Sequence, residues 1–279
     1  MTAADLKSAI RVTVSWVRIL PLPPTKKNMY LEAVTVCVEY SDFLAHTLPH
    51  NKGIFNSMVV ITTPEDKETQ KICKYHHVQY LTTRSFYENG ESFNKARGIN
   101  EGLDFLLKKD WVCHIDADIY LPPQTRRIID NTHFDKKKLY GIDRLMCPDY
   151  ESWSKFTSNP KLIYENYFLV HLDAFPIAPR VVHYNDTGYS PIGYFQMWHP
   201  QGSGVEKYPD CSDGADRTDM VFAKKWHRDM RELIPEIVGI HLDSENATIQ
   251  SMGKNWNGRK TIGFGYQSQK KKRKRFLFF

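Results

Sequence analysis

A chain of 279 residues with 41% apolar and 25% charged residues is long enough for one large domain with a packed core. Its five cysteines are dispersed and form no C-x-x-C pair, which argues against a disulfide scaffold and against a structural zinc site. No run approaches about eighteen consecutive apolar residues, and no signal-peptide pattern opens the chain, so a cytoplasmic protein without a transmembrane segment is expected.

Positive charge is concentrated near the C-terminus. The formal net charge is +6, and the run from Lys270 to Arg275 contributes six positive charges, so the rest of the chain sums to zero. This basic tail, residues 266–279, could hold a polyanion, either nucleic acid or an anionic lipid surface. A solvated terminus without a partner is the alternative.

Short apolar runs alternate with helical periodicity from residue 33 onward. Residues 1–31, which include Pro21, Pro23 and Pro24, are expected to form an N-terminal extension. Strands that alternate with helices of this length predict an α/β fold with a Rossmann-like, doubly wound and mostly parallel sheet. The predicted elements, in chain order, are strand Ala33–Glu39, helix Asp42–His50, strand Ser57–Thr63, a helix opening at Pro64–Asp66, strand Val78–Thr82, helix Asn94–Leu107 and strand Trp111–Ile119.

Acidic residues cluster where these strands are expected to end. In a doubly wound sheet, ligands lie at the carboxyl ends of the strands, near the point where strand order reverses. Asp116 and Asp118 close the fourth predicted strand, so their carboxylates are expected on one side of it, where they repel unless a cation joins them. Carboxylate oxygens suit Mg²⁺ or Mn²⁺, which also bind diphosphate oxygens. The pair therefore predicts a divalent-metal site for a diphosphate ligand.

Two neighbouring segments carry a family resemblance. The segment from Phe93 to Leu103 (FNKARGINEGL), followed by His114 to Asp118 (HIDAD), resembles the core of family-two GT-A glycosyltransferases. In that family a helix with Ala-Arg-Asn and a later Gly-Leu precedes a strand ending in Asp-Ala-Asp. Here an insertion separates Arg97 from Asn100, which departs from the usual adjacent pair. The resemblance spans residues 34–123 and implies the GT-A fold with a nucleotide-sugar donor such as a UDP-sugar.

The resemblance also implies roles for single residues. Asp116, the first acid of the motif, would contact the donor ribose or the metal, and Asp118, the second, would bind the metal. Asp66 matches the acid that contacts the nucleotide base, although a helix cap explains it as well. Glu39 is expected to face the nucleoside, and Arg97 to reach the diphosphate or else to form a structural ion pair.

The expected catalytic base comes from the second half of the chain. The segment from Gly214 to Phe222 resembles the acidic helix start that holds the base in inverting relatives, which makes Asp219 the first candidate and Asp216 the reserve. A base is needed because an acceptor hydroxyl is a poor nucleophile until its proton is removed. For both aspartates the alternative is an acid that merely favours a helix N-terminus.

Two later positions complete the expected site. His241 follows an apolar run and resembles the late histidine that binds the metal in many GT-A enzymes, with a structural histidine as the rival interpretation. Arg259 lies in a segment of cations, amides and glycines that suits a mobile lid over a diphosphate or, alternatively, a contact with the acceptor. The expected organisation is a transferase domain over 32–265, with a nucleotide-sugar half at 32–123 and an acceptor half at 124–265.

The combined hypothesis is metal-dependent transfer of a sugar from a nucleotide-diphosphate sugar to a hydroxyl. Residues 46–118 and 140–153 also resemble uncharacterised phage-type glycosyltransferases, and phage sugar transferases commonly modify hydroxymethylated DNA bases. The basic tail agrees with such a DNA acceptor in an infected host cell. A protein or cell-envelope glycan is the alternative acceptor. A nucleotidyltransferase needs the same carboxylates and metal, but its Gly-rich phosphate loop is absent after the first strand. A binding module that keeps the fold is the third class.

Overall fold

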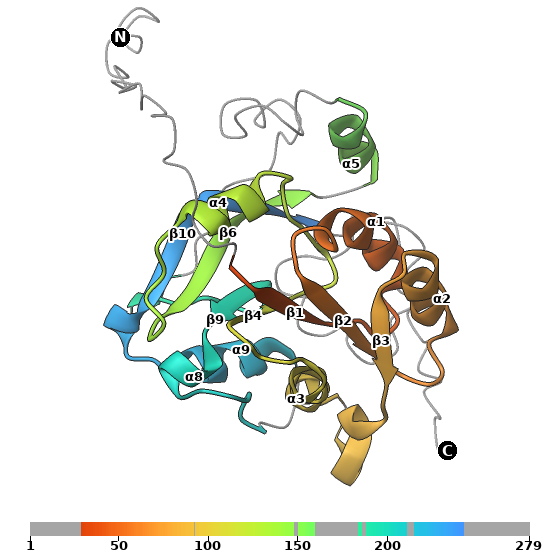
Figure 1. The fold of residues 1–279 in the computed structure, drawn as a ribbon. Helices are drawn as coiled ribbons and strands as arrows, with labels where there is room; N and C mark the ends of the chain where they lie inside the picture. Colours follow the sequence, from red (N-terminus) through yellow and green to blue (C-terminus); the bar gives the residue numbers. More distant parts are fainter. Residues whose placement is uncertain are drawn as a thin grey trace, which may run out of the picture.

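The computed structural model describes residues 29–91, 93–147, 150–159, 184–185, 188–210 and 215–242 (Figure 1). The predicted positions in 253–260 and the basic tail lie outside these residues. None of the helices in the described ranges has the length and apolar character that a membrane crossing requires.

The first half of the fold alternates strands and helices as predicted. Its parallel strands lie side by side in the order β3-β2-β1-β4, so β1 is the central strand from which the chain winds both ways. The short, local signals of apolar period and helix capping place the predicted elements within a few residues of their bounds, although η1 was not predicted and the fourth strand ends at Ile115 and not at Ile119. The elements are β1 (Leu31–Val36), α1 (Ser41–Asn51), β2 (Ser57–Thr62), α2 (Lys67–Tyr75), β3 (Gln79–Thr82), η1 (Ser85–Gly90), α3 (Lys95–Phe105) and β4 (Trp111–Ile115).

The second half extends the same sheet, which reads β3-β2-β1-β4-β9-β6-β10-β5. Strand β9 is antiparallel to both β4 and β6, while β6 and β10 are parallel, so the sheet is mixed but mostly parallel and the predicted α/β class is confirmed. Strands β7 and β8 pair separately. The elements are β5 (Ile119–Tyr120), α4 (Thr125–Asn131), β6 (Leu139–Cys147), α5 (Tyr150–Thr157), β7 (Tyr184–Asn185), β8 (Gly188–Tyr189), β9 (Phe195–Trp198), α8 (Pro200–Ser203), α9 (Ala215–Ala223), η2 (Arg228–Met230) and β10 (Arg231–Leu242).

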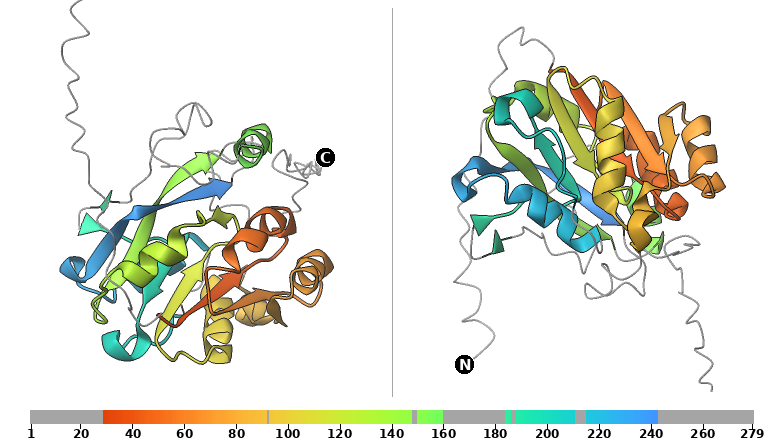
Figure 2. Two further views of the ribbon diagram at one scale, coloured as in Figure 1. Left: turned by 45° about the horizontal axis from the view of Figure 1, so that its top comes forward. Right: turned by 90° about the horizontal axis from the view of Figure 1, so that it is seen from below.

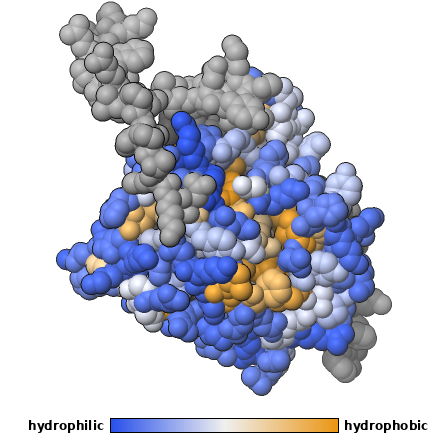
Figure 3. Space-filling model, in the orientation of Figure 1, coloured by the Kyte–Doolittle hydropathy of each residue, from blue (hydrophilic) through white to orange (hydrophobic). Residues whose placement is uncertain are grey.

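Apolar side chains fill both faces of the sheet. Successive residues of β1 point to opposite faces, so Leu31 and Ala33 join one buried cluster while Val34 and Val36 join the other. Helices α1, α2 and α4 pack on the first face and α3 and α9 on the second, which gives three layers (Figures 1 and 2). The surface in the view of Figure 3 is mainly hydrophilic around a central group of apolar residues.

The sheet reverses its winding direction between β1 and β4. The chain runs outward from β1 through β2 to β3 and then crosses back to β4 on the other side of β1. Neighbouring parallel strands whose connections leave in opposite directions create a crevice at their carboxyl ends, where ligands bind in folds of this class. The residues that follow β1 and β4 are therefore the first place to look for a site.

Candidate functional site

The Asp116–Asp118 sequence forms a tight turn between β4 and β5. The amide of Ile119 donates to the carbonyl of Asp116 at 3.2 Å, and β4 ends at Ile115. Asp116 and Asp118 therefore lie just after β4 and not within it, while each still interacts with Lys95. Each carboxylate also has a partner of its own.

Two side chains of helix α1 form hydrogen bonds with the backbone of this turn. The Thr47 hydroxyl donates to the Ala117 carbonyl at 2.6 Å, and the Asn51 amide donates to the Ile119 carbonyl at 2.6 Å. Asn51 also accepts from the Leu121 amide at 2.9 Å, so its side chain satisfies two backbone groups of the segment. Both side chains are buried, and buried hydrogen bonds of this kind fix the turn relative to the sheet.

Lys95 supplies a buried cation to the site. It is the first residue of α3, its side chain is only 3% exposed, and its ammonium contacts Asp116 Oδ1. His114 Nε2 lies 3.4 Å from the same oxygen. Burial, followed by the nearby Lys95 cation, lowers the pKa of His114 well below its usual value, so this imidazole is neutral. Lys95 is therefore the cation that faces Asp116.

Three carboxylates share the surroundings of Lys95. Burial raises the pKa of Asp116 to about 6, although Lys95 opposes this shift; the neighbouring Asp118 and Asp219 add to it. Burial also raises the pKa of Asp219, again against Lys95. Carboxylates gathered in a buried place raise one another's pKa values and attract cations. Such perturbed groups at a ligand-binding edge are typical of functional sites.

Asp118 is linked to His241 and, through it, to Arg144. His241 Nε2 lies 3.1 Å from Asp118 Oδ2, and Arg144 Nη1 lies 2.7 Å from His241 Nδ1. Burial would raise the pKa of Asp118, but His241, Lys95 and Arg144 hold it below its usual value. The amide of Leu242 donates to the Asp118 carbonyl at 2.9 Å, so the end of β10 is joined to the turn.

Asp219 lies one turn into α9 and faces the site. Its Oδ2 accepts from the amide of Gly193, and its Oδ1 accepts from the amide of Met220 at 2.7 Å. A Cβ at Gly193 would lie 2.9 Å from Asp219 Oδ2, so a larger residue there would push the Asp219 side chain away. The side chain of Asp216 lies outside the described residues.

Asp118 and His241 are the pair that best fits a divalent cation. Two ligands at right angles on a six-coordinate cation, each about 2.1 Å from it, lie about 3.0 Å apart. His241 Nε2 and Asp118 Oδ2 are 3.1 Å apart, which matches that separation and is equally an ordinary hydrogen-bond distance. Asp116, the third expected ligand, contacts Lys95 instead. In the described ranges, no group of three or more His, Cys, Asp and Glu side chains is arranged to hold a metal ion.

Asp66 and Glu39 lie together at the ends of β1 and β2. Asp66 caps α2 by accepting from the Thr69 amide at 3.0 Å, and it also accepts from the Glu39 amide at 2.7 Å and from the hydroxyls of Thr62 and Thr69. The cap explanation is therefore correct, and these bonds occupy the carboxylate. Glu39 itself has a left-handed conformation with φ 55°, which is uncommon outside glycine and is often found at binding sites.

Arg97 makes the structural ion pairs that were its alternative role. Its guanidinium lies 3.2 Å from Glu91 and 3.1 Å from Asp210 and also donates to the Glu88 carbonyl. These contacts join α3 to the segments on either side of it. A contact between Arg97 and a diphosphate stays a prediction, as does the role of Arg259, which lies outside the described residues.

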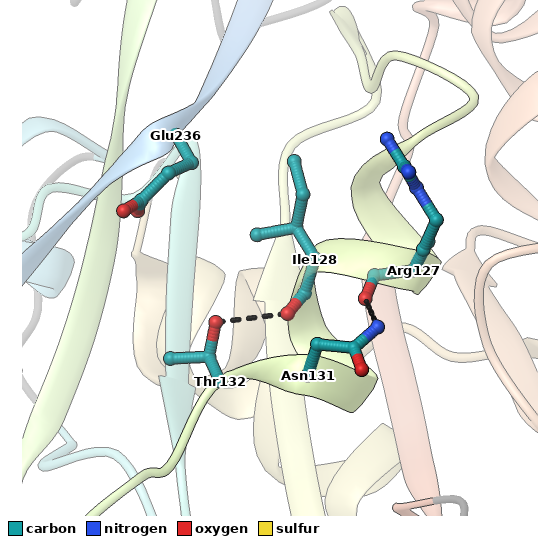
Figure 4. A pocket seen from close by; sticks show the side chains of 5 residues that line it. All are labelled: Arg127, Ile128, Asn131, Thr132 and Glu236. Atoms are coloured by element: carbon teal, nitrogen blue, oxygen red, sulfur yellow. Dashed lines mark hydrogen bonds between the residues drawn. The ribbon is translucent and has the colours of Figure 1, made fainter. Parts of the chain in front are cut away.

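A cavity of about 220 Å³ lies elsewhere, between α4 and β10. Figure 4 shows that the Asn131 amide donates to the Arg127 carbonyl and the Thr132 hydroxyl to the Ile128 carbonyl, at 2.7 and 2.8 Å. Glu236 completes its lining. None of the predicted site residues whose side chains the structure describes borders this cavity.

Sequence reasoning missed Lys95 and Arg144. Lys95 lies on the buried face of α3 with Ile99 and Gly102, at helical spacing, and a cation on an apolar helix face is a signal that could have been used. Arg144 gives no such signal, because its contacts depend on the pairing of β6 with β10, whose residues are far apart in the chain.

Comparisons with known proteins show similarity in fold only. No sequence-family model matches the chain, and no curated protein is significantly similar to it. Inositol-1-phosphate CTP transferase from T. maritima has 9% identity and a TM-score of 0.48, over 81% of this chain and 94% of that chain. Glucosyl-3-phosphoglycerate synthase from Mycobacterium tuberculosis, in complex with Mn²⁺, UDP-glucose and phosphoglyceric acid, has 10% identity and a TM-score of 0.43, over 80% and 74%. Mannosyl-3-phosphoglycerate synthase from Rubrobacter xylanophilus has 13% identity and a TM-score of 0.42, over 80% and 69%.

Proposed function

We propose that this chain is a metal-dependent glycosyltransferase that moves a sugar from a nucleotide-diphosphate sugar to a hydroxyl acceptor. One observation carries the proposal: the buried ammonium of Lys95 contacts Asp116 and interacts with the charges of Asp118 and Asp219 beside the switch point of the sheet. This edge offers candidate cation ligands, a fixed positive charge and a candidate base close to one another. Those are the groups that transfer from a diphosphate donor requires.

Each residue has a chemical role in this proposal. Asp118 and His241 would hold Mn²⁺ or Mg²⁺, which when bound neutralises charge on the departing nucleoside diphosphate. Lys95 would add a second positive charge near the same phosphates. Its ammonium is buried at the start of α3, beside Asp116. Asp219 would accept the proton of the acceptor hydroxyl. Its raised pKa, caused first by burial, makes it a stronger base than an exposed aspartate.

The donor assignment leaves the acceptor open. A hydroxymethylated base in DNA remains our first choice, on the phage-type sequence resemblance and the basic tail. A protein or cell-envelope glycan is the second choice. The tail lies outside the described residues, so the choice depends on binding and transfer measurements.

A donor panel tests the proposal. The full chain is incubated with several nucleotide sugars and Mn²⁺, with and without hydroxymethylated DNA, and the products are identified by mass spectrometry. We expect release of nucleoside diphosphate from at least one donor, loss of that release in EDTA, and loss in Asp118→Asn. The matched control is Asp229→Asn, since Asp229 is 71% exposed on η2.

Two results would overturn the assignment. Release of pyrophosphate from a nucleoside triphosphate, with no reaction of any nucleotide sugar, would identify a nucleotidyltransferase instead. Full activity in excess EDTA would remove the metal from the mechanism and leave Asp118 without the proposed role.

A further inference from the structure

Gln196 joins three separate segments next to the candidate base. Its side chain is fully buried in β9, and its Nε2 donates to the carbonyls of Pro191 and Asp219 at 2.7 and 3.1 Å. Its Oε1 accepts from the hydroxyl of Tyr208. Both N–H groups and the oxygen of the Gln196 amide therefore have partners, as a buried polar side chain requires.

Donor chemistry fixes which way the Gln196 amide points. Backbone carbonyls only accept hydrogen bonds, so the NH₂ group has to face Pro191 and Asp219, and the oxygen has to face Tyr208. Burial raises the pKa of the Tyr208 hydroxyl well above its usual value, so this group keeps its proton and donates it. The reversed amide would place an oxygen against two carbonyl oxygens. Gln196 thus has one favourable orientation.

Tyr208 is itself held on two sides. Its ring stacks on Phe222 of α9, with 3.7 Å between the ring centroids. Asn100 of α3 binds its backbone, because the Asn100 amide donates to the Tyr208 carbonyl at 3.0 Å and the Asn100 oxygen accepts from the Tyr208 amide at 2.8 Å. The hydroxyl that orients Gln196 is therefore anchored to both α3 and α9.

The two carbonyls that Gln196 binds lie on either side of the Gly193–Asp219 hydrogen bond. Pro191 precedes Gly193 by two residues, and the Gly193 amide donates to Asp219 Oδ2. The second carbonyl belongs to Asp219 itself. One side chain thus fixes both the segment that carries the donor of this bond and the helix residue that carries its acceptor.

We propose that Gln196 is a positioning residue for Asp219: it holds the Pro191–Gly193 segment against α9, so that the Asp219 carboxylate keeps one orientation. This inference rests on the proposed function, since Asp219 is the base of that proposal. Gln196 bonds to the backbone of Asp219, while the two carboxylate oxygens accept from Gly193 and Met220. It therefore acts through placement, which matters because a displacement of about 1 Å costs a catalytic group about 100-fold in rate.

Amide hydrogen exchange of the ¹⁵N-labelled, metal-free full chain tests the positioning. Gln196→Met keeps the length of the side chain and removes its donors and its acceptor. The Gly193 amide, assigned by its loss in Gly193→Ala, should exchange about tenfold faster in Gln196→Met than in the parent, because two hydrogen bonds that hold its segment are lost. The rates are taken relative to those of the amides of β1, which report opening of the whole fold.

Gln70→Met is the matched control. Gln70 on α2 is also buried, and its Nε2 also donates to two backbone carbonyls, those of Thr63 and Pro64, at 3.0 and 3.1 Å. The two glutamines therefore lose the same kind of contacts when replaced by methionine. Because Gln70 bonds to neither segment of the Gly193–Asp219 bond, Gly193 exchange in Gln70→Met should stay within about twofold of the parent.

Tyr208→Phe is the milder variant, and it decides the question if Gln196→Met does not fold. It retains the ring that stacks on Phe222 and removes only the hydroxyl that donates to Gln196 Oε1. The Gly193 amide should then exchange about threefold faster than in the parent. A Gly193 amide that is unprotected in the parent, or that exchanges at the parent rate in the folded variant, overturns the proposal.

A kinetic measurement separates positioning from a general loss of stability. With a nucleotide sugar that the parent uses, Gln196→Met should lower kcat at least about tenfold while the KM for the donor stays within about twofold, since it displaces the base and not the donor. Gln70→Met should keep kcat within about twofold of the parent. Equal losses of kcat in Gln196→Met and Gln70→Met would make Gln196 a residue of general stability and overturn the positioning.

The outcomes separate this inference from the proposed function. Release of nucleoside diphosphate from a nucleotide sugar by the parent, with unchanged Gly193 exchange in Gln196→Met, removes the positioning and leaves the transferase. Faster Gly193 exchange in Gln196→Met, without reaction of any nucleotide sugar, keeps the hold of Gln196 on the Asp219 carboxylate and removes the transferase.

Discussion

Replacing Lys95 by methionine should destabilise the protein strongly, because it leaves Asp116 without its cation. Methionine keeps the length of the apolar stem, and the Lys95 side chain is only 3% exposed while that of Asp116 is 20% exposed. Breaking a buried ion pair by removing one partner costs about 3–5 kcal/mol. Since Asp116 keeps some solvent contact, we expect a loss at the lower end, about 3 kcal/mol in the free energy of unfolding.

The coupling between the two residues can be measured in a double-mutant cycle. Urea unfolding of the metal-free protein, followed by tryptophan fluorescence, is compared for Lys95→Met, Asp116→Asn and the double variant. The double variant should lose about 2 kcal/mol less than the sum of the single variants, because no buried charge is left unpaired. Lys155→Met is the control, since its i,i+4 partner Glu151 is 78% exposed, and it should change stability by less than about 0.5 kcal/mol. A Lys95→Met loss as small as that of the control refutes the reasoning.

Three further predictions follow from the site, from α1 and from the tail. Asp219→Asn should lower turnover at least about 100-fold with little change in donor affinity, the usual scale of a missing base; turnover within a few-fold of the parent excludes that role. Burial lowers the pKa values of His46 and His50 below 6.5 in the folded protein, so the unfolded chain binds protons more readily. The stability that these neutral histidines contribute is fully present above pH 6.5 and is lost as the pH falls. The double glutamine variant should show a shallower loss in urea melts between about pH 6.5 and 5, and equal slopes would contradict this assignment. Deleting 270–275 should flatten the salt dependence of DNA binding by up to about 0.9 for each phosphate that the tail neutralises, and an unchanged slope removes the tail from DNA recognition.

The first half of the fold was predictable because its signals are local. The apolar runs around β1 and β2 and the acid at Asp66 identify strands and a capped helix without knowledge of distant contacts. Strand β9 was not predicted, because its four residues carry no strong period and their place between β4 and β6 depends on partners far away in the chain. The local sequence pattern carries no information about strand pairing between distant segments.

The candidate site was predictable in residue type more than in geometry. Asp116, Asp118 and Asp219, which the motifs singled out, lie close enough to affect one another's charge, whereas their roles as metal ligands and base stay predictions. The turn at Ala117 was missed, since a strand and a tight turn both accommodate alternating acids and small residues. The partner of Asp116 was missed because α3 approaches β4 only through tertiary packing.

The insertion of β9 between β4 and β6 has a consequence for synthesis on the ribosome. Ile115 pairs with Phe195 and Val112 with Trp198, so one edge of β4 stays open until a segment about eighty residues later has emerged. At about 5–20 residues per second, that interval lasts about 4–16 seconds. Throughout it, the nascent chain exposes an apolar strand edge of the kind that chaperones bind and that pairs with other chains. Slow codons between the two strands would lengthen this exposure, so the yield of folded protein should depend on translation speed there more than in the segment that encodes β1 to β3.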